Sequence, residues 1–434
     1  MQGLYEKLIL NGWIVAGLFG AFAFLMVAGL APLDVTNVAW IYRQNDVASA
    51  YTGWTFFREA PWAEKIALNP TYGMDFSGSI IFSDAVPVLA IFFKALGPIL
   101  PETFQYFGLW VFISFVLQGV FGWLLMSRAT EDPTARILGA ILISLTPLYC
   151  YRLVSCTHMS LTAHWIVLAA LCLNLPPQPR RPWLWWGLLL AVSAFTHIYL
   201  FAMVATLWLA DVARRAYLDL RQTWVEPIAV TGAVAALIWA TGIWSGPAGV
   251  YQGGFNWFRM NVLAFIDPKG WTLPERPSWS LVMPDIPNWG GDYEGFAYVG
   301  LGGLILAAIA AWSLPQVLRR HPLKTLTVYA PLAVALVGLA IFAVSQNVGF
   351  GSVNFWAWWP APLRALGELF RSTGRFVWPL YYFLFFLAVL VISRRLPPKT
   401  VAAVLAAVAV VQAVEIYPGW RQENAYLHSK DGAY

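Results

Sequence analysis

Charged residues are scarce in this sequence. Lys, Arg, Asp and Glu make up 11% of the 434 residues, whereas 59% are hydrophobic. Soluble globular domains carry about 25% charged residues, so this composition excludes an ordinary soluble enzyme and indicates an integral membrane protein. Cysteine is scarcer still, with three residues. Three are too few for a disulfide framework or a zinc site of the usual spacing.

Nucleotide-binding and nucleic-acid-binding signals are also lacking. The glycine-rich stretch GLGGLIL at 300–306 opens an apolar run and has no lysine after it, so it indicates helix packing. The net charge of +5 comes from short basic clusters that separate apolar runs. This pattern is typical of membrane topology rather than of nucleic-acid binding.

Apolar runs that are long enough to cross a bilayer, or nearly so, recur along the whole chain. The first run is too long for the core of a signal peptide, so we interpret it as a retained span. The sequence therefore predicts an all-α integral membrane protein in which residues 1–434 form a single polytopic domain. We expect about eleven transmembrane helices, at 8–31, 104–127, 136–151, 160–175, 183–197, 198–213, 224–243, 296–314, 325–345, 376–392 and 400–417.

Lys and Arg in the short loops predict the orientation of these helices. With a cytoplasmic N-terminus, every cytoplasmic connection holds at least one basic residue. The long loops at 32–103, 244–295 and 346–375 then face the periplasm, and so does the C-terminus. The apolar stretch at 84–100 is short and broken by proline and glycine. We place it at the membrane surface, because a full span there would reverse every later loop.

The first periplasmic loop, 32–103, is rich in acids and is expected to carry membrane-surface helices. Asp46 precedes an amphipathic stretch that contains Trp54. It either caps that helix or acts as a general base near the membrane surface, and the two roles are compatible. Asp75 fits a turn. Asp84 fits the N-cap of the next short helix better than it fits a catalytic group.

Arg152 and His158 lie in a very short outer loop, against the positive-inside trend. In one interpretation the arginine extends to lipid headgroups and the histidine caps the next helix. In the other, which we favour, the pair binds the phosphate of a lipid-linked substrate. His164 and His197 fit buried structural histidines better than ligands.

The two later outer loops are rich in aromatic residues. The first of them ends in GGDYEGFAYVG, where Asp292 and Glu294 directly precede a span. Aromatic rings beside carboxylates suit sugars, although they also suit an interfacial belt. We assign a functional role to Glu294 and a capping role to Asp292. Arg371 and Arg375 share a face if they are helical, which suits a phosphate diester or bulk anionic lipid.

Taken together, these stretches resemble the GT-C superfamily of membrane glycosyltransferases, and within it a bacterial branch of multi-pass proteins. The resemblance lies in NDVASAYTGWTFFREAPW, FQYFGLW, the run from Arg152 through His158 to His164-Trp165, NVLAFIDP, YEGFAYVGLG and FRSTGRFVWP. It implies an enzyme of the bacterial inner membrane. Such an enzyme transfers a sugar, with inversion, from a polyprenyl-phosphate donor to a cell-envelope glycan, lipid or protein.

The resemblance also implies roles for individual residues. Asp46 matches the position of the superfamily's first-loop acid, so it is the expected catalytic base. The residues expected to bind the donor phosphate are Arg152, His158, Arg371 and Arg375. Those expected to bind the acceptor or the sugar are Asp75, Asp84, Glu294, Trp54 and Tyr293. Several members carry another acid in the second outer loop, where this chain has none. No metal site and no certain cofactor are therefore predicted, and a divalent cation is left open.

Two other functions fit the composition. One is a transporter or flippase of lipid-linked saccharides, and the other is a non-catalytic membrane scaffold. Transporters usually show internal repeats and polar groups at mid-membrane. Here the unusual polar residues cluster at the outer ends of spans, which favours chemistry at the membrane surface.

Overall fold

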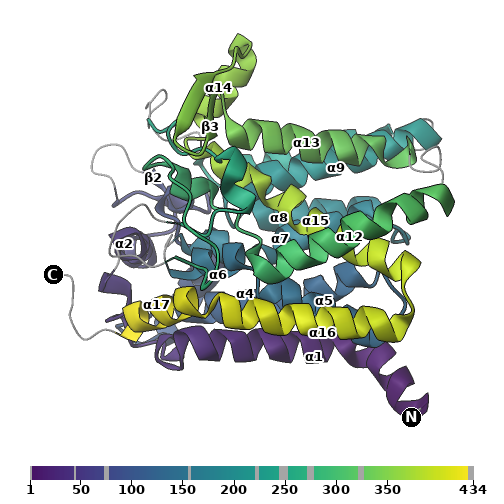
Figure 1. Ribbon diagram of the computed structural model, residues 1–434. Coiled ribbons are helices and arrows are strands. Elements are labelled where there is room, and N and C mark those ends of the chain that lie inside the picture. The colour runs from purple at the N-terminus through teal and green to yellow at the C-terminus, as the bar shows by residue number, and fades with distance from the viewer. Residues whose placement is uncertain are drawn as a thin grey trace.

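Long apolar helices run side by side along one direction (Figure 1). The computed structural model describes residues 2–43, 45–72, 78–154, 158–219, 224–243, 253–270, 278–320 and 327–428. The α-helices are α1 (Gln2–Ala28), α2 (Asn45–Glu59), α3 (Pro87–Ala95), α4 (Phe107–Met126), α5 (Pro133–Ser144), α6 (Pro147–Val154), α7 (Trp165–Asn174), α8 (Pro182–Ala194), α9 (Ile198–Leu218), α11 (Val225–Ala240), α12 (Gly300–Arg320), α13 (Ala330–Val344), α14 (Ala361–Leu369), α15 (Trp378–Arg395), α16 (Pro398–Glu415) and α17 (Tyr417–His428).

Six helices in the described part of the chain are long and apolar enough to cross a membrane. They cover Asn11–Ala28, Phe107–Met126, Gly300–Arg320, Thr327–Val344, Thr373–Arg395 and Pro398–Glu415. Four further apolar helices are shorter: Pro133–Ser144, Trp165–Asn174, Pro182–Ala194 and Val225–Ala240. The prediction of a mainly helical membrane protein is confirmed, and the number of about eleven spans stays a prediction.

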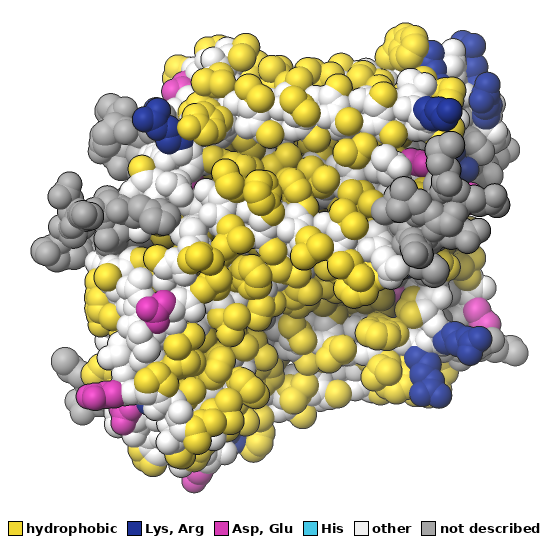
Figure 2. All heavy atoms as spheres, turned by 90° about the horizontal axis from the view of Figure 1, so that it is seen from below, with side chains coloured by type: hydrophobic (Ala, Val, Ile, Leu, Met, Phe, Trp, Pro, Cys, Tyr) yellow, Lys and Arg dark blue, Asp and Glu magenta, His cyan; other side chains and the backbone are white. Residues whose placement is uncertain are grey.

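The helix bundle has α4 near its centre, where it packs against α1, α5 and α7. Helices α1 and α16 lie along one edge in Figure 1, and α9 and α13 pack together along the opposite edge. Helix α12 packs against α15 and α16. Figure 2 shows hydrophobic side chains over the middle of the face that is seen from below. Such a belt suits contact with lipid.

The predicted span at 136–151 is instead two helices, α5 and α6. The break falls between Ser144 and Pro147, because the residue before a proline disfavours helical backbone. Helix α6 therefore begins anew at Pro147 and carries Arg152 in its last turn. This division places Arg152 in a buried position beside the loops.

The long loops, as far as they are described, gather at one end of the bundle, which we call the loop end (Figure 1). The first loop contains α2, α3 and a hairpin of β1 (Leu68–Asn69) with β2 (Gly78–Ser79). Ile66 donates its backbone N–H to the Ala240 carbonyl at 3.0 Å, which holds this loop against the end of α11. Helix α3 has nine residues and is too short to span a bilayer.

A second hairpin was not expected in an all-α protein. Strand β3 (Asn347–Phe350) pairs with β4 (Val353–Trp356), and α14 follows them. The three elements project from the loop end beyond α13 (Figure 1). The hairpin satisfies backbone groups that would otherwise be exposed in a long loop.

The end of the bundle opposite the loops is bound by ion pairs. Asp211 is fully buried and accepts hydrogen bonds from Arg214 at 2.6 Å, Arg215 at 2.9 Å and the Trp186 indole at 2.9 Å. Arg215 also donates two hydrogen bonds to Glu226, each at 2.6 Å. Basic residues that the topology rule counts as cytoplasmic therefore also join α8, α9 and α11.

The orientation can be tested with reporter fusions. Because most basic connections lie opposite the loop end, that side is expected to face the cytoplasm. Green fluorescent protein fused after Arg181, Arg215, Arg320 or Arg395 should fluoresce, and alkaline phosphatase fused at the same positions should be inactive. Fusions within 255–290 should give the reverse. Active phosphatase after Arg320 would contradict the predicted topology.

Candidate active site

Glu294 lies buried between two arginines at the loop end. Arg375 donates two hydrogen bonds to its carboxylate, from Nε to Oε2 at 2.9 Å and from Nη2 to Oε1 at 2.8 Å. Arg152 donates from Nη1 to Oε2 at 2.8 Å and from Nη2 to the Glu294 backbone carbonyl. All three side chains are at most 6% exposed. We call them the Glu294 triad, and its two guanidinium groups and one carboxylate leave one net positive charge.

Two glycines allow the triad to form. Glu294 lies in the 3₁₀ turn η9 (Asp292–Gly295), and Arg375 lies in the 3₁₀ turn η11 (Thr373–Val377). A Cβ atom on Gly374 would lie 2.7 Å from the Cα of Gly295. Any larger residue at position 374 would therefore push the two turns apart. The close approach of these backbones brings Arg375 within reach of Glu294.

A second buried ion pair fixes the start of η9. Arg259 donates from Nε to Asp292 Oδ1 at 3.1 Å, and Asn261 donates to Asp292 Oδ2 at 2.9 Å. The predicted role of Asp292 as a cap of the following span is wrong, because α12 begins only at Gly300 and the Asp292 carboxylate is bonded to Arg259 and Asn261. Asp292 instead holds the turn that carries Glu294.

Burial and charge act on Glu294 in opposite directions. Burial raises the pKa of its carboxyl group, but the charges of Arg375 and Arg152 and the hydrogen bonds from Arg375 outweigh that effect. The pKa therefore lies well below its ordinary value. Glu294 is ionised at neutral pH, so it is unsuited to donate a proton and suited to hold two arginines in place.

Asp84, His158 and His197 form a second group at the loop end. His158 Nδ1 lies 3.2 Å from Asp84 Oδ2, and His197 Nε2 lies 3.7 Å from Asp84 Oδ1. Burial raises the pKa of Asp84, whereas the hydrogen bond and charge of His158 and the charge of His197 lower it. The net effect is a pKa below the usual range, so Asp84 is a carboxylate at neutral pH.

The backbone around Asp84 is strained. Val86 is branched at Cβ and has a φ of +49°, a region that such side chains rarely adopt, and Asp84 has a φ of +53°, which aspartate adopts more readily. Ser160 donates its hydroxyl to the Asp84 carbonyl at 3.2 Å and accepts the Val86 N–H at 3.1 Å. Tyr106 donates its hydroxyl to the carbonyl of Ala85. These bonds hold a conformation that costs about 1–3 kcal/mol per residue.

The predicted capping role of Asp84 is therefore wrong. The N-cap residue of α3 is Val86, which makes no side-chain cap hydrogen bond. The Asp84 carboxylate is directed at the two histidines instead.

The two groups adjoin each other through Tyr199. The Arg375 guanidinium lies 4.8 Å from the centre of the Tyr199 ring, and this ring lies 5.3 Å from the His197 ring. Tyr199 also donates its backbone N–H to His197 Nδ1 at 3.2 Å. We call the combined set the loop-end cluster; its members are Asp84, Arg152, His158, His197, Glu294 and Arg375.

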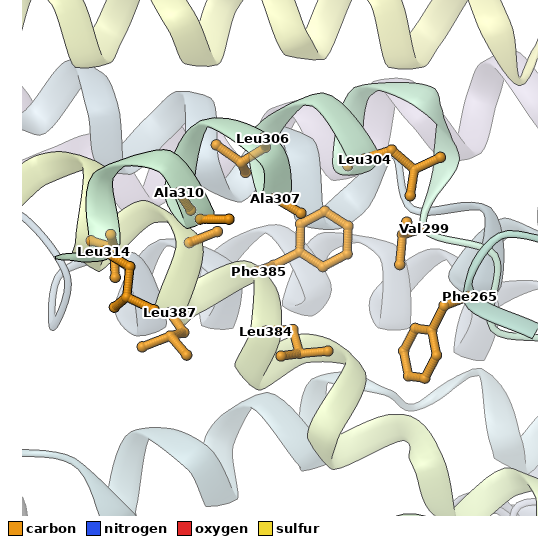
Figure 3. Close-up of a pocket in the computed structure, with 14 residues that line it drawn as sticks. Phe265, Val299, Leu304, Leu306, Ala307, Ala310, Leu314, Leu384, Phe385 and Leu387 are labelled. Carbon is orange, nitrogen blue, oxygen red and sulfur yellow. The ribbon is translucent and has the colours of Figure 1, made fainter. Parts of the chain in front are cut away.

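An apolar groove runs along α12 and α15 (Figure 3). It has a volume of about 320 Å³ and is lined by apolar residues, among them Phe265 and Val299 near the loop end and Leu314 and Val391 far from it. Exposed residues of both helices, such as Leu384, line its mouth. The groove therefore opens on the surface that the membrane would cover.

The chain was compared with known protein families. A family model described as Domain of unknown function (DUF6311) matches residues 17–417. The chain belongs to the DUF6311 family. No curated protein and no solved structure matches it.

In this DUF6311 chain, four of the acceptor or sugar residues that the sequence predicts lie in described segments. Asp84 and Glu294 belong to the loop-end cluster, and Tyr293 is half-buried with its ring edge-on to Phe258. Trp54 is fully buried and donates its indole N–H to a backbone carbonyl at 3.1 Å. That placement favours packing over contact with a sugar. Asp75 lies outside the described residues.

The predicted catalytic base and the residues predicted to bind phosphate do not all lie in one place. Asp46 is exposed in the first turn of α2. Arg152, His158 and Arg375 belong to the loop-end cluster, whereas Arg371 is exposed with its guanidinium carbon 4.9 Å from the Phe258 ring centre. The condition for a shared face of Arg371 and Arg375 is not met, because Arg371 precedes η11 and is not helical; its side chain is exposed and that of Arg375 is buried.

Sequence reasoning missed the part played by His197 and its neighbour Tyr199. Its position at the outer end of a span, like that of His158, was the available signal. The buried position predicted for His164 is confirmed, since it is fully buried and its Nδ1 lies 2.7 Å from the Tyr382 hydroxyl. Within the described ranges, no group of three or more His, Cys, Asp or Glu side chains is arranged to hold a metal ion.

The triad gives a test of stability. Glu294→Gln removes the ionised carboxylate that accepts hydrogen bonds from two buried arginines, which should cost about 3–5 kcal/mol and lower the melting temperature in detergent. The exposed Arg371→Ala variant is the control and should melt like the wild type.

The melting temperatures of the wild type and of Glu294→Gln should depend differently on pH. A carboxyl group with a lowered folded-state pKa stabilises the fold above its unfolded pKa and loses that effect as pH falls. The melting-temperature gap between wild type and Glu294→Gln should therefore be constant near neutrality and narrow below the ordinary pKa of 4.5. A gap that is absent at pH 7 would contradict the importance of the triad.

Proposed function

We propose that this chain is a membrane glycosyltransferase, which transfers a sugar from a polyprenyl phosphate to an acceptor at the loop end. The observation that supports this most is that the turns carrying Glu294 and Arg375 lead into α12 and α15, the two helices along which the apolar groove runs. A polyprenyl-phosphate sugar has the matching parts, an anionic phosphate joined to a long hydrocarbon chain.

The sequence positions make this match concrete. Arg375 lies three residues before α15, and Glu294 lies six residues before α12. Leu384, at the mouth of the groove, follows Arg375 by nine residues. At 1.5 Å per helical residue that is about 13 Å, so one amphipathic molecule could contact both features. The groove volume is also within the range of about 300–1,000 Å³ that ligand pockets commonly have.

In the proposed reaction an acceptor hydroxyl attacks the anomeric carbon of the sugar. The new C–O bond forms as the bond from that carbon to the phosphate oxygen breaks, and the phosphate leaves with the electron pair. The net positive charge of the triad stabilises this leaving group without protonating it. Exposed Arg371 supplies a guanidinium that is free of the triad's carboxylate and can bind phosphate oxygens directly.

The proposal includes a location and an orientation. The protein would lie in a bacterial inner membrane with about eleven spans, a cytoplasmic N-terminus and a periplasmic C-terminus. The loop end, with α2 and the second hairpin, would then face the periplasm and receive a cell-envelope acceptor there. The alternatives are a transporter of lipid-linked sugars and a scaffold. Neither predicts sugar transfer by the purified protein.

Filling the groove should weaken the use of long-chain donors. Ala307→Trp places an indole in the groove, and overpacking of this kind costs about 1–3 kcal/mol. The KM for a long-chain polyprenyl-phosphate sugar should rise about 5- to 150-fold, with little change for a short-chain donor. Ala308→Trp is the matched control, because Ala308 is exposed on the same helix and is not among the residues that line the groove. Equal effects of both variants would show that the groove does not hold the chain.

Removing Arg371 should weaken donor binding more than acceptor binding. A charge-assisted hydrogen bond is worth about 1.5–3 kcal/mol, so Arg371→Ala should raise the donor KM about 10- to 150-fold. Arg371→Lys should restore part of the loss, because lysine lacks the planar fork. The control is Arg364→Ala, because Arg364 is also exposed but lies on α14. An unchanged donor KM in Arg371→Ala would place the phosphate elsewhere.

A further inference from the structure

We propose that His158 is the proton acceptor of the reaction and that Asp84 positions it. This inference rests on the proposed function. It assigns the base to an imidazole in the second outer loop, whereas the sequence predicts Asp46 in the first loop.

Hydrogen bonding determines which nitrogen of each histidine carries a proton. An ionised carboxylate only accepts hydrogen bonds, so His158 must donate its Nδ1–H to Asp84 Oδ2 across 3.2 Å. In a neutral imidazole the other nitrogen, Nε2, is then left with a lone pair. The His158 side chain is 28% exposed, against 16% for Asp84 and 15% for His197. His158 is thus the member of this group that a substrate reaches most easily.

His197 has the opposite arrangement. Its Nδ1 accepts the Tyr199 backbone N–H, so in the neutral ring Nε2 carries the proton. That N–H is directed toward Asp84 Oδ1 at 3.7 Å, and this oxygen is buried with no hydrogen bond from any described residue. His197 therefore cannot accept a proton at Nδ1 without losing a backbone contact. His197 stabilises the ionised Asp84 carboxylate, and His158 is then the residue that can accept a proton.

The backbone holds the pair rigidly. Ser160, two residues after His158, binds both the Asp84 carbonyl and the Val86 N–H. The segment that carries the imidazole therefore also fixes the strained segment that carries the carboxylate. Strain that surrounding bonds maintain is common at functional sites. A carboxylate that only packed against a histidine would not need two consecutive restraints of this kind.

Charged groups surround His158 on several sides. Asp84 faces it directly, His197 lies across the carboxylate, and Glu294 is close enough that the charge of His158 lowers the pKa of Glu294. Arg152 and Arg375 neutralise Glu294. The site thus combines an oriented base with a neighbouring positive region, which suits a departing phosphate.

The proposed step transfers one proton and replaces one carbon–oxygen bond by another. His158 Nε2 takes the proton of the acceptor hydroxyl while that oxygen bonds to the anomeric carbon. The carbon–oxygen bond to the phosphate breaks, and the phosphate leaves as an anion. The imidazolium formed is stabilised by Asp84 and later returns its proton to water. Asp84 stays ionised throughout, as the orienting carboxylate does in a Ser-His-Asp triad.

The first experiment does not depend on activity. The chain has five histidines, so imidazole ¹⁵N spectra of the full-length protein in nanodiscs can be assigned by single His→Gln substitutions. At a pH where the rings are neutral, His158 should show the Nδ1–H form and His197 the Nε2–H form. Asp84→Asn should shift His158 toward Nε2–H. A wild-type His158 in the Nε2–H form would overturn the inference whatever the protein catalyses.

The second experiment measures sugar transfer from a synthetic polyprenyl-phosphate sugar. His158→Gln should lower kcat about 10²- to 10⁴-fold and should leave the donor KM little changed. Adding Asp84→Asn to His158→Gln should cause little further loss, because the two residues act as a unit. Glu59→Gln, at an exposed carboxylate of α2, is the control.

The outcomes separate the two proposals. Wild-type protein that transfers no sugar but shows the expected tautomers contradicts the proposed function and leaves the dyad geometry supported. Active protein in which Asp46→Asn abolishes transfer and His158→Gln does not would overturn the inference in favour of Asp46. If His158→Gln does not fold, the tautomers of wild type and Asp84→Asn still decide, and a wild-type His158 in the Nε2–H form overturns the inference.

Discussion

The contact on which the loop end depends is the buried carboxylate of Glu294 between two guanidinium groups. It joins three segments that are far apart in sequence, since Arg152 and Glu294 are 142 residues apart and Glu294 and Arg375 are 81 apart. Burying three charges is costly unless every one is paired, and loss of one partner leaves the others uncompensated. The Arg259–Asp292 pair and the glycine contact at Gly374 hold the same turns in register.

Around this contact, polar and apolar features divide along the helix axis. Asp84, Glu294 and their partners lie at the loop end, the outer face seen in Figure 2 is hydrophobic over its middle, and Asp211 and Glu226 join helices at the opposite end. This division also separates the paired charges of the loop-end cluster from the apolar lining of the groove.

Much of the helical framework could be predicted from the sequence, because hydropathy alone marks apolar helices in a membrane protein. Charges that break the topology rule also marked Arg152, His158 and Arg375 before any contact was known. Their partners could not be predicted, since pairing between residues 74 to 142 positions apart depends on packing and not on local pattern. Asp84 was misjudged for the same reason. A carboxylate before a helix has the local pattern of a cap. Only the fold shows that this carboxylate contacts histidines from two other loops instead.

The glycine contact between η9 and η11 has a consequence for the membrane-embedded part of the protein. Helices α12 and α15 start just after these turns, so the salt bridge sets their spacing where the groove begins. The width of the groove at the loop end therefore depends on an ionic contact that lies outside the apolar lining. Bilayers of different thickness change the tilt of helices at modest cost. In this protein such tilting would pivot about a fixed point, opening or narrowing the far end of the groove while its entrance keeps one size.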